Sequence, residues 1–488
     1  MYRRTNTQRS FFEVGSLMPQ AQREACRKSW AGAFREKALP ILLKREDAFA
    51  ELFDKTEGRP NRSVALVIGA LLLKEVNNLT DEEVLGSLDF DARFWYAFDV
   101  EMGGSRICQK TLHNFRAGLM VHDKSRLVFR CLTDELVKAL GVDVTRQRLD
   151  STHVLSNFAS LTRLKLFCET IRLFLKGLKK RNGPAYETIW AGVLKRYGEE
   201  SGYADARREE GPRRLAVAAR DAYRLVDRFR GDSSEDYRLL ERLVLEQCDI
   251  LTTAQTPGED EDDHPEGGVP VKLKVAKEVE SSSLQTPHDE GVTYSGHKGK
   301  GYETQIAETC HPENPVELLT HVEVTASCVS DARATVRTVD ALESAGLKPE
   351  ELVADTGYSG ASNAAEVALR GVNLLSPCPA KGKPESGKEY PKPATKCPTD
   401  KETAGEWLKR QEAHESFKKR YAIRAGIEGT NSEMKRRHGL GRLRVRGEDR
   451  VRLAVYFKAA ACNLKRALSY WMEPMALPPM SRPLPGIV

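Results

Sequence analysis

Two aspartates in this 488-residue chain follow runs that predict β-strands. Asp150 lies toward the end of the β-capable run 144–152, and Asp355 directly follows the buried run 352–354 and precedes a turn that contains glycine. A carboxylate at the carboxyl end of a strand points into the crevice where α/β sheets bind ligands. An aspartate in this position is more often a helix cap or a turn residue. Neither residue by itself therefore identifies a site.

A helix expected from Ser416 onward carries further groups that could do chemistry. At about 100° per residue, an aromatic hydroxyl, two cations and a carboxylate share a stripe about 60° wide. These residues are Tyr421, Arg424, Glu428 and Lys435, whereas Ile423, Ile427 and Met434 form a separate apolar face. The ordinary alternative is a solvated face in which Arg424 pairs with Glu428 at i,i+4 spacing.

The pattern Tyr421-x2-Arg424-x3-Glu428-x6-Lys435 matches in full the signature of a large group of bacterial insertion-sequence DDE transposases. The block that begins at Asp150 resembles the first catalytic block of that group, and the block from Asp355 to Tyr358 resembles the second. Segments 284–289 and 301–305 resemble the approach to the group's second strand. The similarity runs from about residue 60 to about residue 470. One departure is a helical insertion before the second aspartate, since many relatives place theirs after it.

The resemblance implies an α/β fold: a ribonuclease-H-like catalytic core, split by a helical insertion and preceded by an all-α N-terminal domain. Asp150 and Asp355 are 205 positions apart, and without residues 160–285 they would be 79 apart. The shorter distance accommodates two strands and a helix before the strand that bears the second aspartate. The insertion is therefore expected after the first strand of the core.

Hydrophobic periodicity and composition predict the elements and the domain boundaries. Helices are expected at 21–34, 38–53, 63–76, 81–88, 331–345, 361–369, from 416, and at 451–471; strands at 302–309, 318–326, 352–354 and 372–375; and a loop at 379–404. The expected domains are a helical region for DNA-end binding or dimerisation at 1–143, the first part of the core at 144–159, the insertion at 160–252, an acidic linker at 253–285, the second part of the core with basic C-terminal helices at 286–470, and a Pro-rich tail at 471–488.

By the resemblance, Asp150, Asp355 and Glu428 are the catalytic residues and the metal ligands. Three neighbouring carboxylates repel one another when all are ionised, and hard oxygen ligands suit Mg²⁺ or Mn²⁺. Two ions in each active site are expected, for an in-line phosphoryl transfer. Water would first nick the DNA at the element end, and the freed 3′-hydroxyl would then attack the target DNA.

The expected DNA contacts follow the same helix. Tyr421, Arg424 and Lys435 suit the phosphates of the terminal nucleotides. A dense basic run follows them, and beside a metal triad we expect it to track the DNA backbone; its residues are Arg436, Arg437, Arg442, Arg444 and Arg446. Residues 406–466 hold 17 Lys and Arg against 7 Asp and Glu, a balance of +10, whereas the remainder holds 59 against 63, a balance of −4.

Weaker signals lie near the first aspartate. His153 is expected either to orient Asp150 or a phosphate, or to be a structural histidine. The Gly-rich turn that holds His297, Lys298 and Lys300 does not match a dinucleotide-binding pattern.

Composition narrows the class of protein. The longest apolar run, 64–73, is shorter than the roughly 20 residues that span a bilayer. The ten cysteines are scattered, which indicates reduced thiols rather than zinc sites. We expect a bacterial cytoplasmic protein, associated with the nucleoid when active.

The expected function is transposition. The enzyme would bind the terminal inverted repeats and the target as double-stranded DNA, and act as a homodimer on DNA, without a membrane. Two alternatives stay open: a DNA nuclease of the same fold without strand transfer, and a catalytically inactive DNA-binding derivative.

Overall fold

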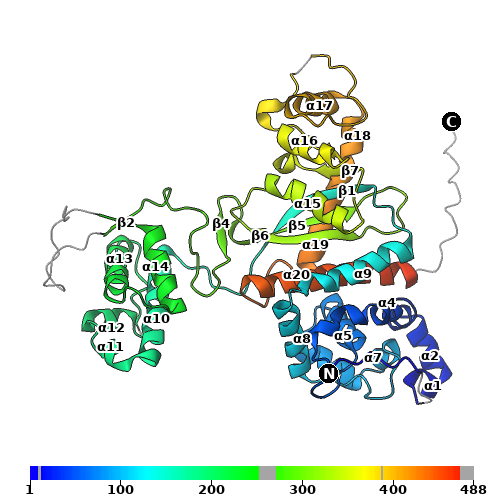
Figure 1. The fold of residues 1–488 in the computed structure, drawn as a ribbon, viewed down its shortest axis with the longest axis horizontal. Coiled ribbons are helices and arrows are strands. Elements are labelled where there is room, and N and C mark those ends of the chain that lie inside the picture. The colour runs from blue at the N-terminus through cyan, green and yellow to red at the C-terminus, as the bar shows by residue number, and fades with distance from the viewer. Residues whose placement is uncertain (9–11, 200, 252–270, 386–387, 473–488) are drawn as a thin grey trace, which may run out of the picture.

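A mixed β-sheet lies at the centre of the molecule (Figure 1). The computed structural model describes residues 1–8, 12–199, 201–251, 271–385 and 388–472. The strands of the sheet are β1 (Arg146–Val154), β4 (Thr293–Ser295), β5 (Gly299–Thr309), β6 (Leu319–Ala326), β7 (Glu351–Ala354) and β8 (Asn373–Leu375). They lie in the order β6-β5-β1-β7-β8, and β4 pairs with the start of β5. The first three strands are antiparallel, whereas β7 and β8 run parallel to β1.

This strand order confirms the expected fold class. An antiparallel meander, followed by two parallel strands on the other side of the first, is the ribonuclease-H-like arrangement. The central strands lie in the interior of the protein: β5 is buried along most of its length, and β7 is a short run with three buried residues. Helix α15 (Ala332–Ser344) leads from β6 to β7, and α16 (Ala361–Leu369) leads from β7 to β8. The expected strands and helices of this part of the core are therefore present.

Helices fill the chain before β1, as the fold class requires. They are α1 (Val14–Leu17), α2 (Gln20–Arg27), α3 (Trp30–Ala33), the π-helix Phe34–Ala38, α4 (Leu39–Lys44), the 3-10 helix Glu46–Leu52, α5 (Val64–Val76), α6 (Asp81–Phe90), α7 (Ala92–Ala97), α8 (Gln109–Val121) and α9 (Ser125–Leu140). The apolar run 64–73 is buried in full on α5, which is a core helix. At the start of α6, Thr80 and Glu83 form a capping box.

A separate helical unit lies between β1 and β5. Its elements are α10 (Arg163–Arg181), α11 (Gly183–Glu187), α12 (Ala191–Tyr197), α13 (Gly211–Arg228), α14 (Glu235–Gln247), β2 (Cys248–Ile250) and β3 (Val271–Leu273). They surround an apolar core of their own, with Phe167, Phe174 and Leu240 fully buried. In Figure 1 this unit, in green, extends away from the sheet. Ser234 caps the start of α14, where its side chain accepts a hydrogen bond from the Tyr237 N–H.

The last helix joins the sheet to the N-terminal helices. Helix α20 (Glu448–Met472) packs against α5 and α9 on one side and against β6 on the other (Figure 1). This double contact explains why it is buried on more than one face, from Val451 to Leu468. No described helix is both long enough and apolar enough to cross a membrane.

Two expectations for local structure were wrong. The predicted loop at 379–404 contains a 3-10 turn at Ala380–Gly382 and the start of α17 (Lys401–Ala413), whose first turn Asp400 caps. The helix is hard to predict because it follows a segment rich in proline and lysine and has a short apolar face. That face buries mainly Ala404, Trp407 and Leu408. The long helix from Ser416 is instead α18 (Phe417–Tyr421), a 3-10 turn at Ala422–Ala425, and α19 (Gly426–Arg436). Most of the predicted linker and tail, 253–270 and 473–488, lies outside the described residues.

Candidate active site

The parallel pairing of β1 and β7 brings the two aspartates side by side. Leu149 is paired with Ala354, so the next residue on each strand is Asp150 and Asp355 respectively. Asp150 lies in the middle of β1 rather than at its end, because the pairing with β5 continues to Val154. It is nevertheless at the carboxyl end of the β7 pairing. Asp150 is buried, whereas Asp355 is partly exposed.

A tight turn holds Asp355 in place. The 3-10 turn Thr356–Tyr358 follows directly, and the Asp355 Oδ1 accepts a hydrogen bond from the Gly357 N–H at 2.8 Å. The other carboxylate oxygen, Oδ2, is the one nearest to Arg424, at 3.8 Å. The turn therefore occupies one oxygen of Asp355 and leaves the other facing the site.

The third carboxylate comes from α19. Its side chain, Glu428, is 66% exposed and lies near the start of the helix. The 3-10 turn before α19 is stabilised by Arg148 on β1, which donates to the Ile423 carbonyl at 2.7 Å. A Cβ on Gly426 would overlap the Arg148 guanidinium, so this approach requires glycine. The break in the predicted helix thus has a physical cause in the sheet beneath it.

One guanidinium lies among all three carboxylates. Arg424 Nη2 is 3.3 Å from Asp150 Oδ2 and 3.8 Å from Asp355 Oδ2, and Arg424 Nη1 donates to Glu428 Oε1 at 2.8 Å. The three acids come from a strand, a strand end and a helix. They converge closely enough for a single cation to contact them together.

The electrostatics of the site favour a cation. Burial raises the pKa of Asp150, and the neighbouring Asp355 adds to this rise, whereas Arg424 and the Ser151 N–H oppose it. Burial lowers the pKa of Arg424, but Asp150, Tyr421 and Asp355 outweigh this effect and the net direction is upward. The ionised aspartates therefore destabilise each other unless positive charge is present.

The contacts that hold α19 on the sheet are buried. Glu308 on β5 is fully buried and accepts hydrogen bonds from Arg148 on β1, Thr430 on α19 and Arg466 on α20. Arg466 also donates to Glu433 on α19. Two strands and two helices are therefore joined at one point beneath Glu428.

Other side chains near the aspartates were not assigned from the sequence. Asn431 donates to Asp150 Oδ2 at 3.0 Å, and it follows Glu428 by three residues, a spacing at which helical side chains are neighbours and a signal that could have identified it. Lys298 donates to Ser151 at 3.0 Å and to Glu303 at 2.9 Å, and it lies 3.9 Å from Asp331. The Gly-rich turn that the sequence indicated only weakly therefore places a cation, Lys298, beside the site. No sequence pattern singled out Asp331.

Both ring nitrogens of His153 lie within hydrogen-bonding distance of neighbouring groups. Its Nδ1 is 3.1 Å from Glu303 Oε1, and its Nε2 is 3.1 Å from the Lys300 carbonyl oxygen. Of the two interpretations of His153, the structure favours the structural histidine, because both ring nitrogens are engaged away from Asp150.

The predicted DNA-contacting residues spread from this site. Tyr421 is half-buried, stacks on Phe417 with ring centroids 5.3 Å apart, and has its pKa raised by burial. Exposed cations continue along the end of α19 and the segment after it: Lys435, Arg436, Arg437, Arg442, Arg444 and Arg446. The backbone at Arg442 forms an isolated parallel β-bridge with Leu155, just beyond the end of β1. Arg442, Arg444 and Arg446 are exposed, whereas Leu443 between them is buried and Val445 packs against the core.

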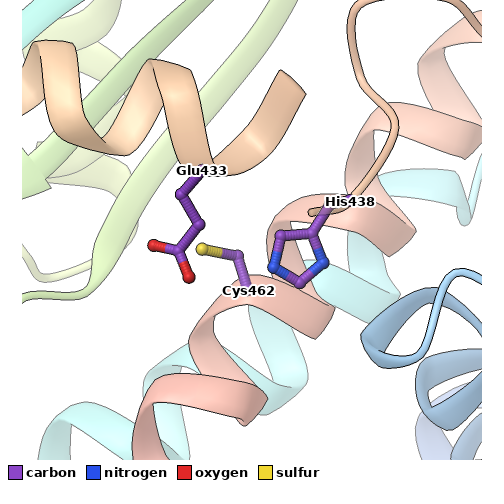
Figure 2. A group of neighbouring side chains, drawn as sticks. All are labelled: Glu433, His438 and Cys462. Carbon is purple, nitrogen blue, oxygen red and sulfur yellow. The ribbon is translucent and has the colours of Figure 1, made fainter. Parts of the chain in front are cut away.

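A second group of potential ligands lies behind α19 (Figure 2). Glu433, His438 and Cys462 bring one donor atom each within 4.8 Å of one another. Arg466 already donates two hydrogen bonds to Glu433, at 3.1 and 2.9 Å. Burial lowers the pKa of His438 to about 4 and raises that of the Cys462 thiol to about 12. With a guanidinium on its carboxylate and a protonated thiol, we interpret this group as packing between α19 and α20.

Comparison with known proteins supports an enzymatic domain. Residues 276–464 match the family model described as the transposase DDE domain. The match includes Asp355, Glu428 and the basic residues from Lys435 to Arg446, and Asp150 precedes it. No curated protein and no solved structure matches the chain. The matched residues 276–464 are therefore similar to a domain of a catalytic family that transfers phosphoryl groups on DNA.

Proposed function

We propose that this protein is a DNA transposase that binds the terminal inverted repeats of an insertion sequence, and that it cleaves and joins DNA by metal-dependent phosphoryl transfer. The observation that carries the proposal is the convergence of Asp150, Asp355 and Glu428 on one guanidinium. This convergence lies largely within a domain of the DDE family.

The donor set fits divalent cations. Three carboxylates of three separate elements offer hard oxygen ligands, and a cation already contacts all of them. Asp150, Asp355 and Glu428 would hold the metal. When bound, two Mg²⁺ or Mn²⁺ ions would supply Lewis-acid stabilisation of the attacking and leaving oxygens.

The protein's own groups would bind and orient the DNA. Tyr421, Arg424 and Lys435 would hold the terminal phosphates, so that the scissile bond faces the carboxylates. The exposed side chains of Arg442, Arg444 and Arg446 would follow the backbone of the duplex. Water would attack the phosphodiester at the element end, and the released 3′-hydroxyl would attack the target strand.

The remaining regions would assemble the complex. We assign end binding or dimerisation to residues 1–143, with two copies of the chain bringing the two element ends together. The division at 144–159, 160–252 and 286–470 is our proposal for the two parts of the core and the insertion. Such a reaction on chromosomal DNA would take place at the nucleoid of a bacterial cell.

Isosteric variants test the triad. Asp150→Asn, Asp355→Asn and Glu428→Gln should each reduce Mg²⁺-dependent cleavage of a duplex from the ends of the gene's flanking DNA by at least about a hundredfold. Glu366→Gln is the matched control, because Glu366 is exposed on α16 away from the site. Full cleavage by Glu428→Gln would overturn the triad. Nicked product without any joined product would instead identify a nuclease without strand transfer.

A further inference from the structure

Arg424 has two incompatible tasks. Its guanidinium contacts the three carboxylates that would hold metal ions, at 2.8, 3.3 and 3.8 Å. The proposed function also assigns Arg424 to a DNA phosphate. A planar guanidinium presents its N–H donors in one fixed fork. It cannot direct the same donors to the carboxylates and to a phosphate at once.

The backbone at Arg424 is fixed by a contact with the sheet, whereas its guanidinium is held by the carboxylates. The 3-10 turn at Ala422–Ala425 is held from below by the hydrogen bond between Arg148 and the Ile423 carbonyl. The Arg424 side chain is 19% exposed. Its Nε is buried and has no hydrogen-bond partner among the described residues. The contacts that hold the guanidinium are therefore those made by its two terminal nitrogens.

The neighbouring cations do not take this place. Lys298 is the other cation near Asp150, but its ammonium is engaged by Ser151 and Glu303. Arg148 is committed to Glu308 and to the Ile423 carbonyl. Arg420, four residues before Arg424, pairs with Glu351 on β7. Of the described cations near the aspartates, Arg424 is the one whose guanidinium lies among all three carboxylates.

We propose that Arg424 is a shared counter-ion that couples metal loading to DNA binding; this inference rests on the proposed function. Without metal, Arg424 neutralises Asp150, Asp355 and Glu428. Divalent cations that bind these carboxylates displace the guanidinium, which then becomes free to hold a DNA phosphate. The coupling is reciprocal, because a phosphate that takes the guanidinium also frees the carboxylates for metal.

Metal binding to the full chain without DNA provides the first test. Titration with Mn²⁺ should give roughly tenfold tighter binding to Arg424→Gln than to the wild type, because the competing cation is gone. Arg424→Lys keeps the charge but loses the fork, and its affinity should lie between the two. Arg420→Gln removes a nearby arginine that does not contact the carboxylates, so it should bind Mn²⁺ like the wild type.

The controls separate this inference from the proposed function. Asp150→Asn should weaken Mn²⁺ binding strongly; if it does not, the carboxylates are not a metal site and the proposed function fails with the inference. If Asp150→Asn weakens binding and Arg424→Gln leaves it unchanged, the inference alone is overturned.

DNA affinity provides a second readout without catalysis. The probe is a DNA duplex that carries the terminal inverted repeat from the DNA flanking the gene, and it is titrated with and without Ca²⁺. Ca²⁺ should tighten binding by the wild type more than by Arg424→Gln, by a factor of roughly five to ten. Equal tightening in both proteins would overturn the coupling. The melting temperature in the absence of metal shows that each variant is folded before either titration.

Discussion

Glu308 is the best place to test how α19 is held over the sheet. Its side chain is fully buried, and it accepts hydrogen bonds from Arg148 at 2.7 Å, from Thr430 at 2.7 and 2.9 Å, and from Arg466 at 3.1 Å. Glu308→Gln removes the negative charge and keeps the shape. It leaves two largely buried guanidinium groups without their shared anion.

The expected magnitude follows from this burial. Breaking a buried ion pair by removing one partner costs about 3–5 kcal/mol, because the remaining charge stays desolvated. Such a loss is a large part of a typical domain stability of about 5–15 kcal/mol. Arg148 also supports the 3-10 turn through the Ile423 carbonyl, so the loss should be felt where Arg424 and Glu428 are positioned.

Two measurements check this prediction. Unfolding in urea should show a decrease of about 3–5 kcal/mol for Glu308→Gln, and amide exchange should show weaker protection in α19 before the N-terminal helices open. Glu343→Gln is the control, because Glu343 pairs with Lys348 at the surface, and its effect should stay below about 1 kcal/mol. A loss below about 1 kcal/mol for Glu308→Gln would refute the role of this network.

Three further predictions concern the rest of the chain. Gly426→Ala should destabilise the protein by about 1–3 kcal/mol, because the new Cβ displaces the doubly bound Arg148, whereas Gly429→Ala on the same helix has open space and should be neutral or stabilising in urea unfolding. Hydrogen bonds from Arg116 lower the pKa of Asp81 from 3.8 to about 2, so about 2 kcal/mol of stability should be lost as the pH falls from about 4 through about 2; Asp81→Asn should lose this part of the acid sensitivity in unfolding at each pH. The affinity for duplex DNA should fall steeply with salt, and replacing the exposed cations by alanine should reduce the log–log slope by roughly 0.9 for each phosphate that is no longer neutralised, whereas a salt-independent affinity would contradict the proposed binding to the DNA backbone; these cations are Arg442, Arg444 and Arg446.

Local patterns predicted much of the core. The helix at 361–369 and the strand before Asp355 lie where periodicity and burial place them. These elements are set by neighbouring residues, so short-range sequence is sufficient. Helix α17 was missed because its apolar face is short and follows a Pro- and Lys-rich segment. The break between α18 and α19 was missed because Arg148, which stabilises it, is 275 positions from Ile423, on β1.

The sequence by itself determined the fold class and the contacts between side chains that are close together in the chain. The i,i+4 contact of Arg424 with Glu428 is an example, since both residues lie on one stretch of backbone. Only the tertiary structure decided that Asp150 and Asp355 are neighbours, because the register of β1 with β7 joins residues that lie 205 positions apart in the chain. It also decided that Arg424 contacts all three carboxylates. That arrangement depends on buried charge pairing among β1, β5, α19 and α20, which no local pattern encodes.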